Sequence, residues 1–374
     1  TLTVPNSDAV LVFSMIGMRK QEIKIGDNTT LSVTLFTDSK IMEEVVVVGY
    51  GSQRKAELTS AISSVKKEDI KVSTVATLSE ALQGKTPGVE VINNSNSPGG
   101  DVSVRVRGIS SLNNSIQPLY VVDGVPISGG ISFLNNNDVA SVEVLKDAAA
   151  ASIYGSRGAN GVILVTTNKG KRDNKMSITA DASLSFQNPS HMIEMMKPAE
   201  YAKTLQAFHD NDGTGLTLSP SEATSAGTDW MSLITRPNAP MQNYNITVSG
   251  GTDKIIYSSS LSYFNQKGVV KTSDYDKLNY HLNTEVNATD KLKIGNSFVF
   301  SSANRHLIPN EGSLWNSIFN TAMNTDPITP VYYSQNELDA NAASGYNTNE
   351  YSVYHRAMYT NAGNPVGQLA RNFQ

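Results

Sequence analysis

Cysteine is absent from this chain of 374 residues. Its absence excludes disulfide bridges, thiolate nucleophiles and zinc or iron–sulfur sites built on cysteine. An excess of positive charge is also missing, since the formal net charge is -4. A protein that binds nucleic acid through its phosphates needs a basic face, so we expect no nucleic-acid partner.

Long apolar runs are missing as well. The longest, residues 9–18 and 44–49, fall short of the roughly 20 residues that a membrane-spanning helix needs. Any contact with the interior of a membrane would therefore be made by β-strands. No basic segment followed by an apolar run opens the chain, so we expect that a signal peptide was removed or that the N-terminus is missing.

Motifs for catalysis, metal binding and nucleotide binding are not found either. The five histidines are scattered, without His-Glu-x-x-His spacing. The glycine-rich residues 155–161 lack the Gly-Lys-Ser/Thr of a phosphate loop, and Arg54 occupies the third glycine position of a possible dinucleotide loop. Turn and helix-capping preferences explain residues 135–138 without a calcium ion. We expect no catalytic residue, no cofactor, no metal and no enzymatic activity.

The first part of the chain is predicted to be β-structure. Residues 10–15, 22–25 and 30–35 have the pattern of short strands separated by turn residues, which corresponds to half of a small β-sandwich. We expect this domain to begin upstream. Residues 45–48 are four consecutive valines, which favour extended backbone, and they are either a buried central strand or a strand with a free edge.

Residues 77–168 are predicted to form a compact α+β unit. Residues 77–80 have the pattern of a capping box before a short helix. A second short helix is expected at residues 148–154, capped by Asp147. Strands are predicted at residues 89–92, 102–107, 119–122, 142–145 and 162–167.

Strict alternation of apolar and polar residues begins after residue 171. It is clearest in residues 178–187 and 278–287, and residues 244–249, 257–263 and 292–300 behave similarly. Strands of about ten residues joined by tight turns are typical of a transmembrane β-barrel. A large antiparallel sheet of a soluble protein is the alternative. Residues 189–236 are expected to be a long loop with a helix after Pro198, and residues 303–374 mostly loop.

Three blocks of sequence resemble the SusC/RagA-type TonB-dependent transporters of Bacteroidetes outer membranes. They are residues 43–51, residues 82–89 together with 104–108 and 118–126, and residues 143–162. Residues 228–230, 242–245 and 249–252 resemble the early barrel strands, and the resemblance weakens toward the C-terminus. The resemblance covers nearly the whole chain and identifies it as the N-terminal part of such a transporter.

This resemblance implies a mainly β fold with an α+β plug. Residues 1–40 would be the C-terminal part of a carboxypeptidase-regulatory-like β-sandwich, and residues 41–55 a TonB box with its linker. Residues 56–171 would be the TonB-dependent receptor plug domain. Residues 172–374 would be the beginning of a large transmembrane antiparallel β-barrel with long outer loops. They supply about six to eight strands, whereas plugged barrels need about 22.

The resemblance also implies which residues are functional. The TonB box comprises Glu43, Glu44, Val45, Val46, Val47, Val48, Gly49 and Tyr50. The plug motif comprises Gly84, Pro87, Gly88, Arg105, Arg107, Gly108, Asp123, Gly124, Lys146, Asp147, Tyr154, Gly155, Arg157, Gly158 and Gly161. Arg105 and Arg107 are predicted to share one strand face, where they either meet carboxylates of the barrel lumen or remain solvated.

The implied function is energy-coupled nutrient uptake through the cell outer membrane. TonB and its inner-membrane motor complex would pull on the TonB box and displace the plug, while a SusD-like surface lipoprotein covers the barrel. Outer-membrane lipid would surround the barrel, with the plug and TonB box facing the periplasm. The substrate would be a glycan or an oligopeptide, and the sequence does not identify which. The alternatives are a siderophore or vitamin receptor, a signal transducer, and a soluble periplasmic binding or adhesion module.

Overall fold

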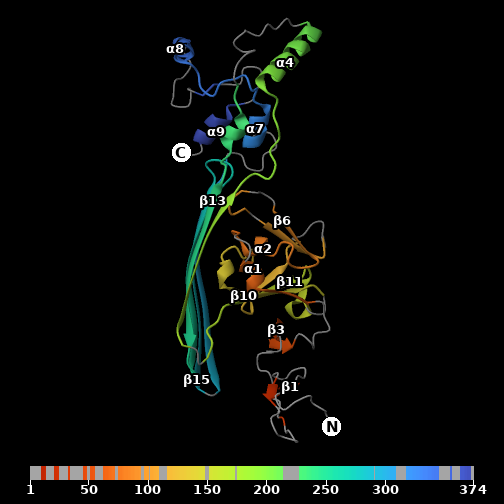
Figure 1. Cartoon of the computed structure of the whole chain (residues 1–374), viewed down its shortest axis with the longest axis vertical. Helices are drawn as coiled ribbons and strands as arrows, with labels where there is room; N and C mark the ends of the chain where they lie inside the picture. The colour runs from red at the N-terminus through yellow and green to blue at the C-terminus, as the bar shows by residue number, and fades with distance from the viewer. Residues whose placement is uncertain are drawn as a thin grey trace.

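The structure is a computed structural model, and it is mainly β (Figure 1). It describes residues 10–13, 21–24, 33, 45–48, 51–54, 62–71, 75–93, 97–100, 102–108, 116–147, 151–172, 175–213, 227–289, 291–308, 317–344, 354–355 and 363–371. A tall curved sheet runs along one side, an α+β domain lies against it, and a group of helices lies beyond one end of the sheet (Figure 1).

The N-terminal region contains two short hairpins. Strand β1 (Val10–Phe13) pairs with β2 (Gln21–Lys24), and β3 (Val45–Val48) pairs with β4 (Gly51–Arg54). The third strand expected at residues 30–35 falls outside the described residues except for position 33. Within the described part of the chain, β3 has β4 as its only strand neighbour, so β3 is not a central strand there.

The α+β domain is built on a five-stranded sheet. Its strands lie in the order β5 (Ile62–Lys66), β10 (Val139–Leu145), β11 (Val162–Thr167), β8 (Leu119–Val122) and β9 (Val125–Ile127). Only the β11–β8 pair is parallel. A separate hairpin joins β6 (Val89–Asn93) and β7 (Val102–Val106). Strands β8, β10 and β11 are almost wholly buried, which explains why they are continuous apolar runs rather than alternating ones.

Short helices cover the sheet of this domain. They are α1 (Lys67–Lys71), α2 (Leu78–Ala81) and the 3₁₀ turn η2 (Asn136–Asp138). The predicted N-cap of α2 is confirmed, because the Thr77 side chain accepts a hydrogen bond from the Glu80 amide. Asn135 caps η2 in the same way, through the Asn137 amide.

Of the helix predicted at residues 148–154, Ala151 is helical and its amide donates to the Asp147 carbonyl at 3.0 Å, whereas residues 152–154 are not α-helical and residues 148–150 lie outside the described part. Residues 152–158 instead form η3 (Ser152–Gly158), a 3₁₀ segment. Gly155 interrupts it with φ +60° and ψ −147°, a conformation that only glycine adopts readily. The change from α-helical to 3₁₀ geometry comes at Ser152, and Gly155 then breaks the 3₁₀ segment.

The curved sheet, here called the wall sheet, is a five-stranded antiparallel meander. It comprises β12 (Ser177–Gln187), β13 (Ala239–Gly251), β14 (Ile255–Lys267), β15 (Asp274–Thr289) and β16 (Leu292–His306). Five strands are found in the described residues, fewer than the six to eight expected. Most are longer than predicted, because backbone pairing continues beyond the segments that alternate in polarity.

The two faces of the wall sheet differ in polarity, and their arrangement is the reverse of that in a water-soluble sheet, here called inverted polarity. The face toward the α+β domain buries polar side chains, among them Asn245, Ser260 and Asn279. The opposite face exposes large apolar ones, including Phe186 and Leu261. A sheet in water shows the reverse arrangement, with apolar side chains inside. The alternation therefore separates a polar interior from an apolar exterior, as in a transmembrane barrel.

Helices gather at one end of the wall sheet (Figure 1). They are α4 (Pro198–Asp212), α6 (Trp230–Ile234), α7 (Ile318–Asn324), α8 (Gln335–Ala343) and α9 (Pro365–Arg371). The helix expected after Lys197 is confirmed as α4, with Pro198 at its first turn. The expectation that residues 303–374 are mostly loop is wrong for α7, α8 and α9. Apolar residues of α6, α7 and α9 pack into one small core, which stabilises helices too short to form alone.

Among the described residues, no helix is both long and apolar enough to cross a membrane.

Candidate functional site

The α+β domain is held on the polar face of the wall sheet along a seam. The seam is the contact of residues 76 and 131–138 of the domain with strands β14 and β15. The side chains of the wall come from alternate positions, since successive residues of a strand point to opposite faces. They donate mainly to main-chain carbonyls of the domain.

Lys277 is the most heavily engaged residue of the seam. It is 2% exposed, on β15. Its Nζ donates to the carbonyl oxygens of Ala76 at 3.2 Å, Ser132 at 3.1 Å and Leu134 at 3.1 Å. All three ammonium protons thus have acceptors, which is the condition under which a buried charge is tolerated.

Amide and hydroxyl side chains extend the seam on both sides of Lys277. Asn279 donates to the Phe133 carbonyl. Asn135 of the α+β domain donates to Ser262 Oγ at 2.6 Å. Because these groups are buried, losing one partner would leave the other unsatisfied at a cost of roughly 1–3 kcal/mol.

Asp138 brings a negative charge into the seam. Its carboxylate accepts a hydrogen bond from Ser260. Burial raises the pKa of the Asp138 carboxyl, while the Ser260 hydrogen bond and the nearby His281, Lys67 and Lys277 side chains act to lower it. The acid of the seam therefore lies near several basic side chains, which favour its charged form.

The predicted plug residues lie mainly at turns and inside the α+β domain. Asp123 and Gly124 have φ values of +49° and +86° and form the turn between β8 and β9. The Asp123 carboxylate accepts from the Thr167 amide at 2.9 Å and from Thr167 Oγ1 at 2.6 Å. It also accepts from Ser297 Oγ of the wall sheet at 3.3 Å. Asp123 therefore fixes this turn to β11 and contacts the wall.

The basic residues of the predicted motif have partners within the α+β domain. Arg105 lies 3.8 Å from Glu90 across the β6–β7 hairpin, and Arg107 is paired with Asp147. The expectation that both arginines share a strand face is wrong, because β7 ends at Val106 and Arg107 has φ +60°. Both partners belong to the α+β domain, and among the described residues neither arginine is paired with a carboxylate of the wall sheet.

Two other basic residues tie neighbouring turns together. Lys146 Nζ donates to the Pro87 carbonyl at 2.9 Å, beside Gly88. Arg157 donates to Ser128 Oγ at 3.1 Å. Gly84 and Gly108 have positive φ at the surface, and Tyr154 packs partly buried against the core of Leu119 and Leu164. These residues position turns, and none of them faces the seam.

Gly158 and Gly161 allow close packing at the C-terminal end of η3, Gly161 against β7. A Cβ at Gly161 would lie 2.9 Å from Val106 Cβ, and one at Gly158 would lie 2.8 Å from the Ala151 carbonyl oxygen. Gly161 also has φ +89°. Both steric contact and backbone conformation therefore require glycine at position 161.

Gly161→Ala is expected to destabilise the α+β domain by roughly 2–4 kcal/mol, the sum of left-handed strain and overpacking. Gly124→Ala is the matched control, because Gly124 has φ +86° but open space around its Cβ position. It should cost only roughly 1 kcal/mol. Amide hydrogen exchange of β7 and β11 in the full-length protein would measure both. Equal effects of the two substitutions would contradict the packing role of Gly161.

The residues of the seam were not predicted from the sequence. A usable signal was present, since Lys277, Asn279 and His281 occupy the polar phase of the alternating segment. Of the predicted TonB box, β3 is described, whereas Glu43, Glu44, Gly49 and Tyr50 lie outside the described residues. In the described part of the chain, no group of three acidic or histidine side chains is placed to hold a metal ion.

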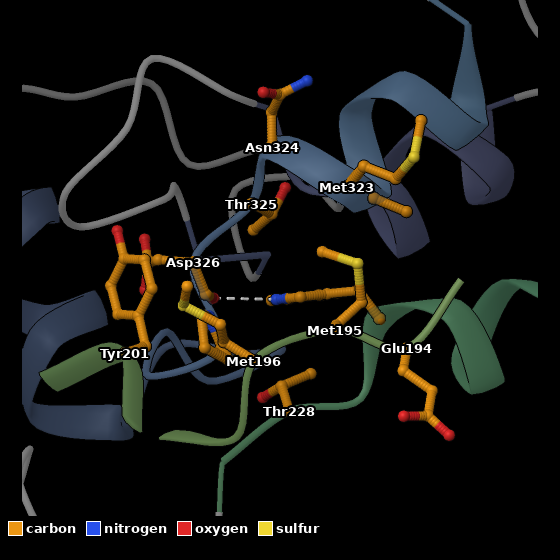
Figure 2. A pocket seen from close by; sticks show the side chains of 12 residues that line it. Glu194, Met195, Met196, Tyr201, Thr228, Met323, Asn324, Thr325 and Asp326 are labelled. Atoms are coloured by element: carbon orange, nitrogen blue, oxygen red, sulfur yellow. Dashed lines mark hydrogen bonds between the residues drawn. The ribbon is translucent and has the colours of Figure 1, made fainter. Parts of the chain in front are cut away.

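A cavity of about 310 Å³ lies between α4, α6 and α7. Figure 2 shows that Met195, Met196 and Met323 come from distant segments and border the same space. Trp230 forms part of the lining and donates its Nε1 proton to the Asp326 carbonyl at 2.9 Å, the dashed line in Figure 2. Thioether and aromatic groups give this cavity an adaptable apolar lining.

Comparison with known proteins relates the chain to outer-membrane receptors. The family described as TonB-dependent Receptor Plug Domain matches residues 54–162. TonB-dependent receptor P26 of Formosa agariphila is 35% identical over 100% of this chain and 36% of its own length. TonB-dependent receptor SusC of Bacteroides thetaiotaomicron is 31% identical over 95% of this chain and 35% of its own length.

A solved structure agrees with these relatives. The RagAB peptide importer in its closed-closed state matches 72% of this chain and 34% of the solved chain, with a TM-score of 0.63 and 27% identity. The chain spans about a third of the length of the curated relatives it matches. By its plug domain, its barrel strands and these relatives, the chain belongs to the SusC/RagA-type family of TonB-dependent transporters.

Proposed function

We propose that the protein takes part in energy-coupled uptake of a nutrient across the cell outer membrane. Residues 56–171 act as the plug domain and residues 172–374 begin the transmembrane barrel that it closes. Residues 41–55 supply the TonB box and its linker, and residues 1–40 are the end of a carboxypeptidase-regulatory-like sandwich. The proposal rests on family membership and on the seam between plug domain and wall sheet.

The inverted polarity of the wall sheet is the observation that carries this proposal. Ile178, Leu184 and Phe186 of β12 are each about 60% exposed on the outer face. Leaving such side chains in water costs roughly 1.5–3 kcal/mol each relative to burial. Lipid removes that cost, whereas a soluble binding or adhesion module would retain it. The polar inner face, in turn, suits the hydrogen bonds that seat the plug domain.

The TonB box is proposed at residues 43–50, around strand β3. Its two-stranded sheet with β4 leaves one edge of β3 without a strand neighbour among the described residues. An extended segment with a free edge can pair with a strand of a periplasmic partner through main-chain hydrogen bonds. TonB, with its inner-membrane motor complex, is the partner that we assign to this edge.

The substrate is proposed to be a glycan or an oligopeptide, covered on the outside by a SusD-like lipoprotein. The relative SusC and the RagAB peptide importer support a nutrient importer over a siderophore receptor, a vitamin receptor or a signal transducer. Among the described residues near the helices at the end of the wall sheet, the cavity beside Trp230 offers an apolar contact to such a substrate or to the SusD-like lipoprotein.

The proposed function is tested with the full-length gene in its own outer membrane. Cells are supplied with labelled glycan and labelled peptide pools, and uptake is measured. The measurement is repeated after deletion of TonB and after deletion of the neighbouring gene for the SusD-like lipoprotein. We expect uptake of one pool that requires both genes. Uptake that is independent of TonB, or a protein that lacks the heat-modifiable migration of a folded barrel, would contradict the proposal.

A further inference from the structure

The end of the wall sheet that lies away from the helices carries a group of lysines (Figure 1). The strand register places the start of β12, the β13–β14 turn and the β15–β16 turn at this same end. Four exposed lysines occupy these junctions, and we call them the lysine rim. They are Lys171, Lys175, Lys254 and Lys291.

The main chain holds the segments of the lysine rim next to one another. The Lys254 carbonyl accepts a hydrogen bond from the Asn287 amide at 2.7 Å, which joins the β13–β14 turn to the end of β15. A Cβ at Gly251 would lie only 2.5 Å from the Lys171 carbonyl oxygen, so the segment before β12 crosses the end of β13 in close contact. The lysines therefore belong to one surface, although they are far apart in the sequence.

This surface is positively charged. Residues 169–175, 253–254 and 285–293 contain seven basic and four acidic residues, whereas the whole chain has a formal net charge of -4. Glu285 is shared by Arg172 at 3.3 Å and Lys293 at 2.8 Å. Within the described residues, none of the four lysines of the rim is paired with a carboxylate. Their ammonium groups are therefore available to an anionic ligand.

The charged residues at the opposite end of the wall sheet are arranged differently. Asp274 is paired with Lys267 at 3.0 Å and with His306 at 2.6 Å. Asp276 accepts a hydrogen bond from Asn304 at 3.1 Å. These groups compensate one another within the protein. Unpaired positive charge is thus a feature of the end that lies away from the helices.

The lysine rim borders the apolar outer face of the wall sheet. Three of its lysines are followed directly by an apolar residue that is between 46% and 64% exposed. These pairs are Lys175–Met176, Lys254–Ile255 and Lys291–Leu292. One residue of a strand spans about 3.3 Å, and a lysine stem can follow apolar surface while its ammonium group reaches outward. The charge therefore lies at the boundary of the apolar face.

We infer that the lysine rim binds phospholipids with anionic headgroups in the periplasmic leaflet of the outer membrane. The acyl chains cover the apolar outer face, and the headgroup phosphates contact the lysines. A soluble acidic partner would use the charge but would leave the adjacent apolar band exposed. This inference rests on the proposed function, which places the outer face in lipid and this end of the sheet toward the periplasm.

The test counts the lipids that the purified full-length protein retains in a neutral detergent, by native mass spectrometry. The protein is titrated separately with phosphatidylglycerol and with phosphatidylcholine, whose headgroup is zwitterionic. At low salt we expect phosphatidylglycerol to bind roughly tenfold more tightly. High salt should remove this difference, because it screens exposed charges. Equal binding of the two lipids at low salt would overturn the inference.

A pair of substitutions in the rim isolates the contribution of the lysines. Lys254→Gln combined with Lys291→Gln should abolish the preference for phosphatidylglycerol. Lys197→Gln combined with Lys203→Gln is the matched control, because both lysines are exposed at the helical end of the molecule. It should leave the preference unchanged. Heat-modifiable migration shows that each variant is folded. A folded rim variant that keeps the preference would refute the inference.

Two further probes separate a lipid from other anionic ligands. Glycerophosphoglycerol, the headgroup without acyl chains, should not bind at the concentrations at which the lipid does. Isolated peptidoglycan should not retain the protein. Binding of the free headgroup as tight as that of the lipid, or retention on peptidoglycan that depends on the rim, would overturn the inference. A full-length protein that stays soluble without detergent and retains neither lipid would contradict the proposed function itself.

Discussion

Lys277→Met is expected to make the outer membrane of cells that produce the full-length protein permeable to large hydrophilic antibiotics such as vancomycin. The substitution leaves the carbonyls of Ala76, Ser132 and Leu134 without their shared donor. Methionine has nearly the same length but donates no hydrogen bond. The plug domain is then held less firmly against the wall, and the barrel opens without TonB.

The size of this effect follows from two opposing contributions. Each hydrogen bond from a charged group contributes roughly 1.5–3 kcal/mol. Part of their sum is offset, because the Lys277→Met protein no longer has to desolvate a buried ammonium group. We expect a net loss of roughly 2–4 kcal/mol in the stability of the seated plug. Such a loss raises the unseated population by about 30- to 1000-fold.

Lys267→Met is the matched control. Lys267 lies on the neighbouring strand and pairs with Asp274 at 3.0 Å, but its side chain is 41% exposed. A pair of this kind contributes at most about 1 kcal/mol, so antibiotic entry should not change. Antibiotic sensitivity that is the same in Lys277→Met cells and wild-type cells would contradict the role of the seam.

Val46→Pro is expected to abolish uptake in the intact protein while substrate binding at the cell surface remains unchanged. Proline has no amide proton and cannot continue a paired strand at position 46, so β3 loses the extended geometry that strand addition requires. It also restricts the preceding residue, but β3 lies outside the plug domain and the wall sheet, so neither should be disturbed. The measurements are labelled-substrate uptake and surface binding in the same cells.

Val46→Ala serves as the comparison for this substitution. It shortens the side chain but retains the amide, and strand addition depends mainly on main-chain hydrogen bonds. Uptake should remain within a few-fold of wild type. Undiminished uptake in the Val46→Pro protein would refute the assignment of residues 43–50 as the TonB box.

Much of the local structure was predictable, because it depends on interactions between residues close in sequence. Strands β8 and β11 have the bounds predicted for them, residues 119–122 and 162–167. The α2 cap at Thr77 needs only a hydroxyl three residues before an amide. The wall strands follow the polar–apolar alternation, although the sequence left open which face would be buried.

Helical structure was predicted less well. The alanine-rich run before residue 155 favours a helix, and Ala151 is helical, but residues 152–158 form a 3₁₀ segment that Gly155 interrupts. Helices α7 and α9 are too short to be recognised from periodicity. They persist because Ile318 and Leu369 share a core with Trp230, which is far away in the sequence.

The sequence alone determined the family, the order of elements and the presence of strands with two different faces, because these depend on local pattern and on motifs. Only the tertiary structure decided that Arg105 and Arg107 pair within the plug domain, and that Lys277 reaches three carbonyls more than a hundred residues away in the chain. The physical reason is that a charged side chain could pair with many different groups elsewhere in the chain. Burial and close packing select one of them.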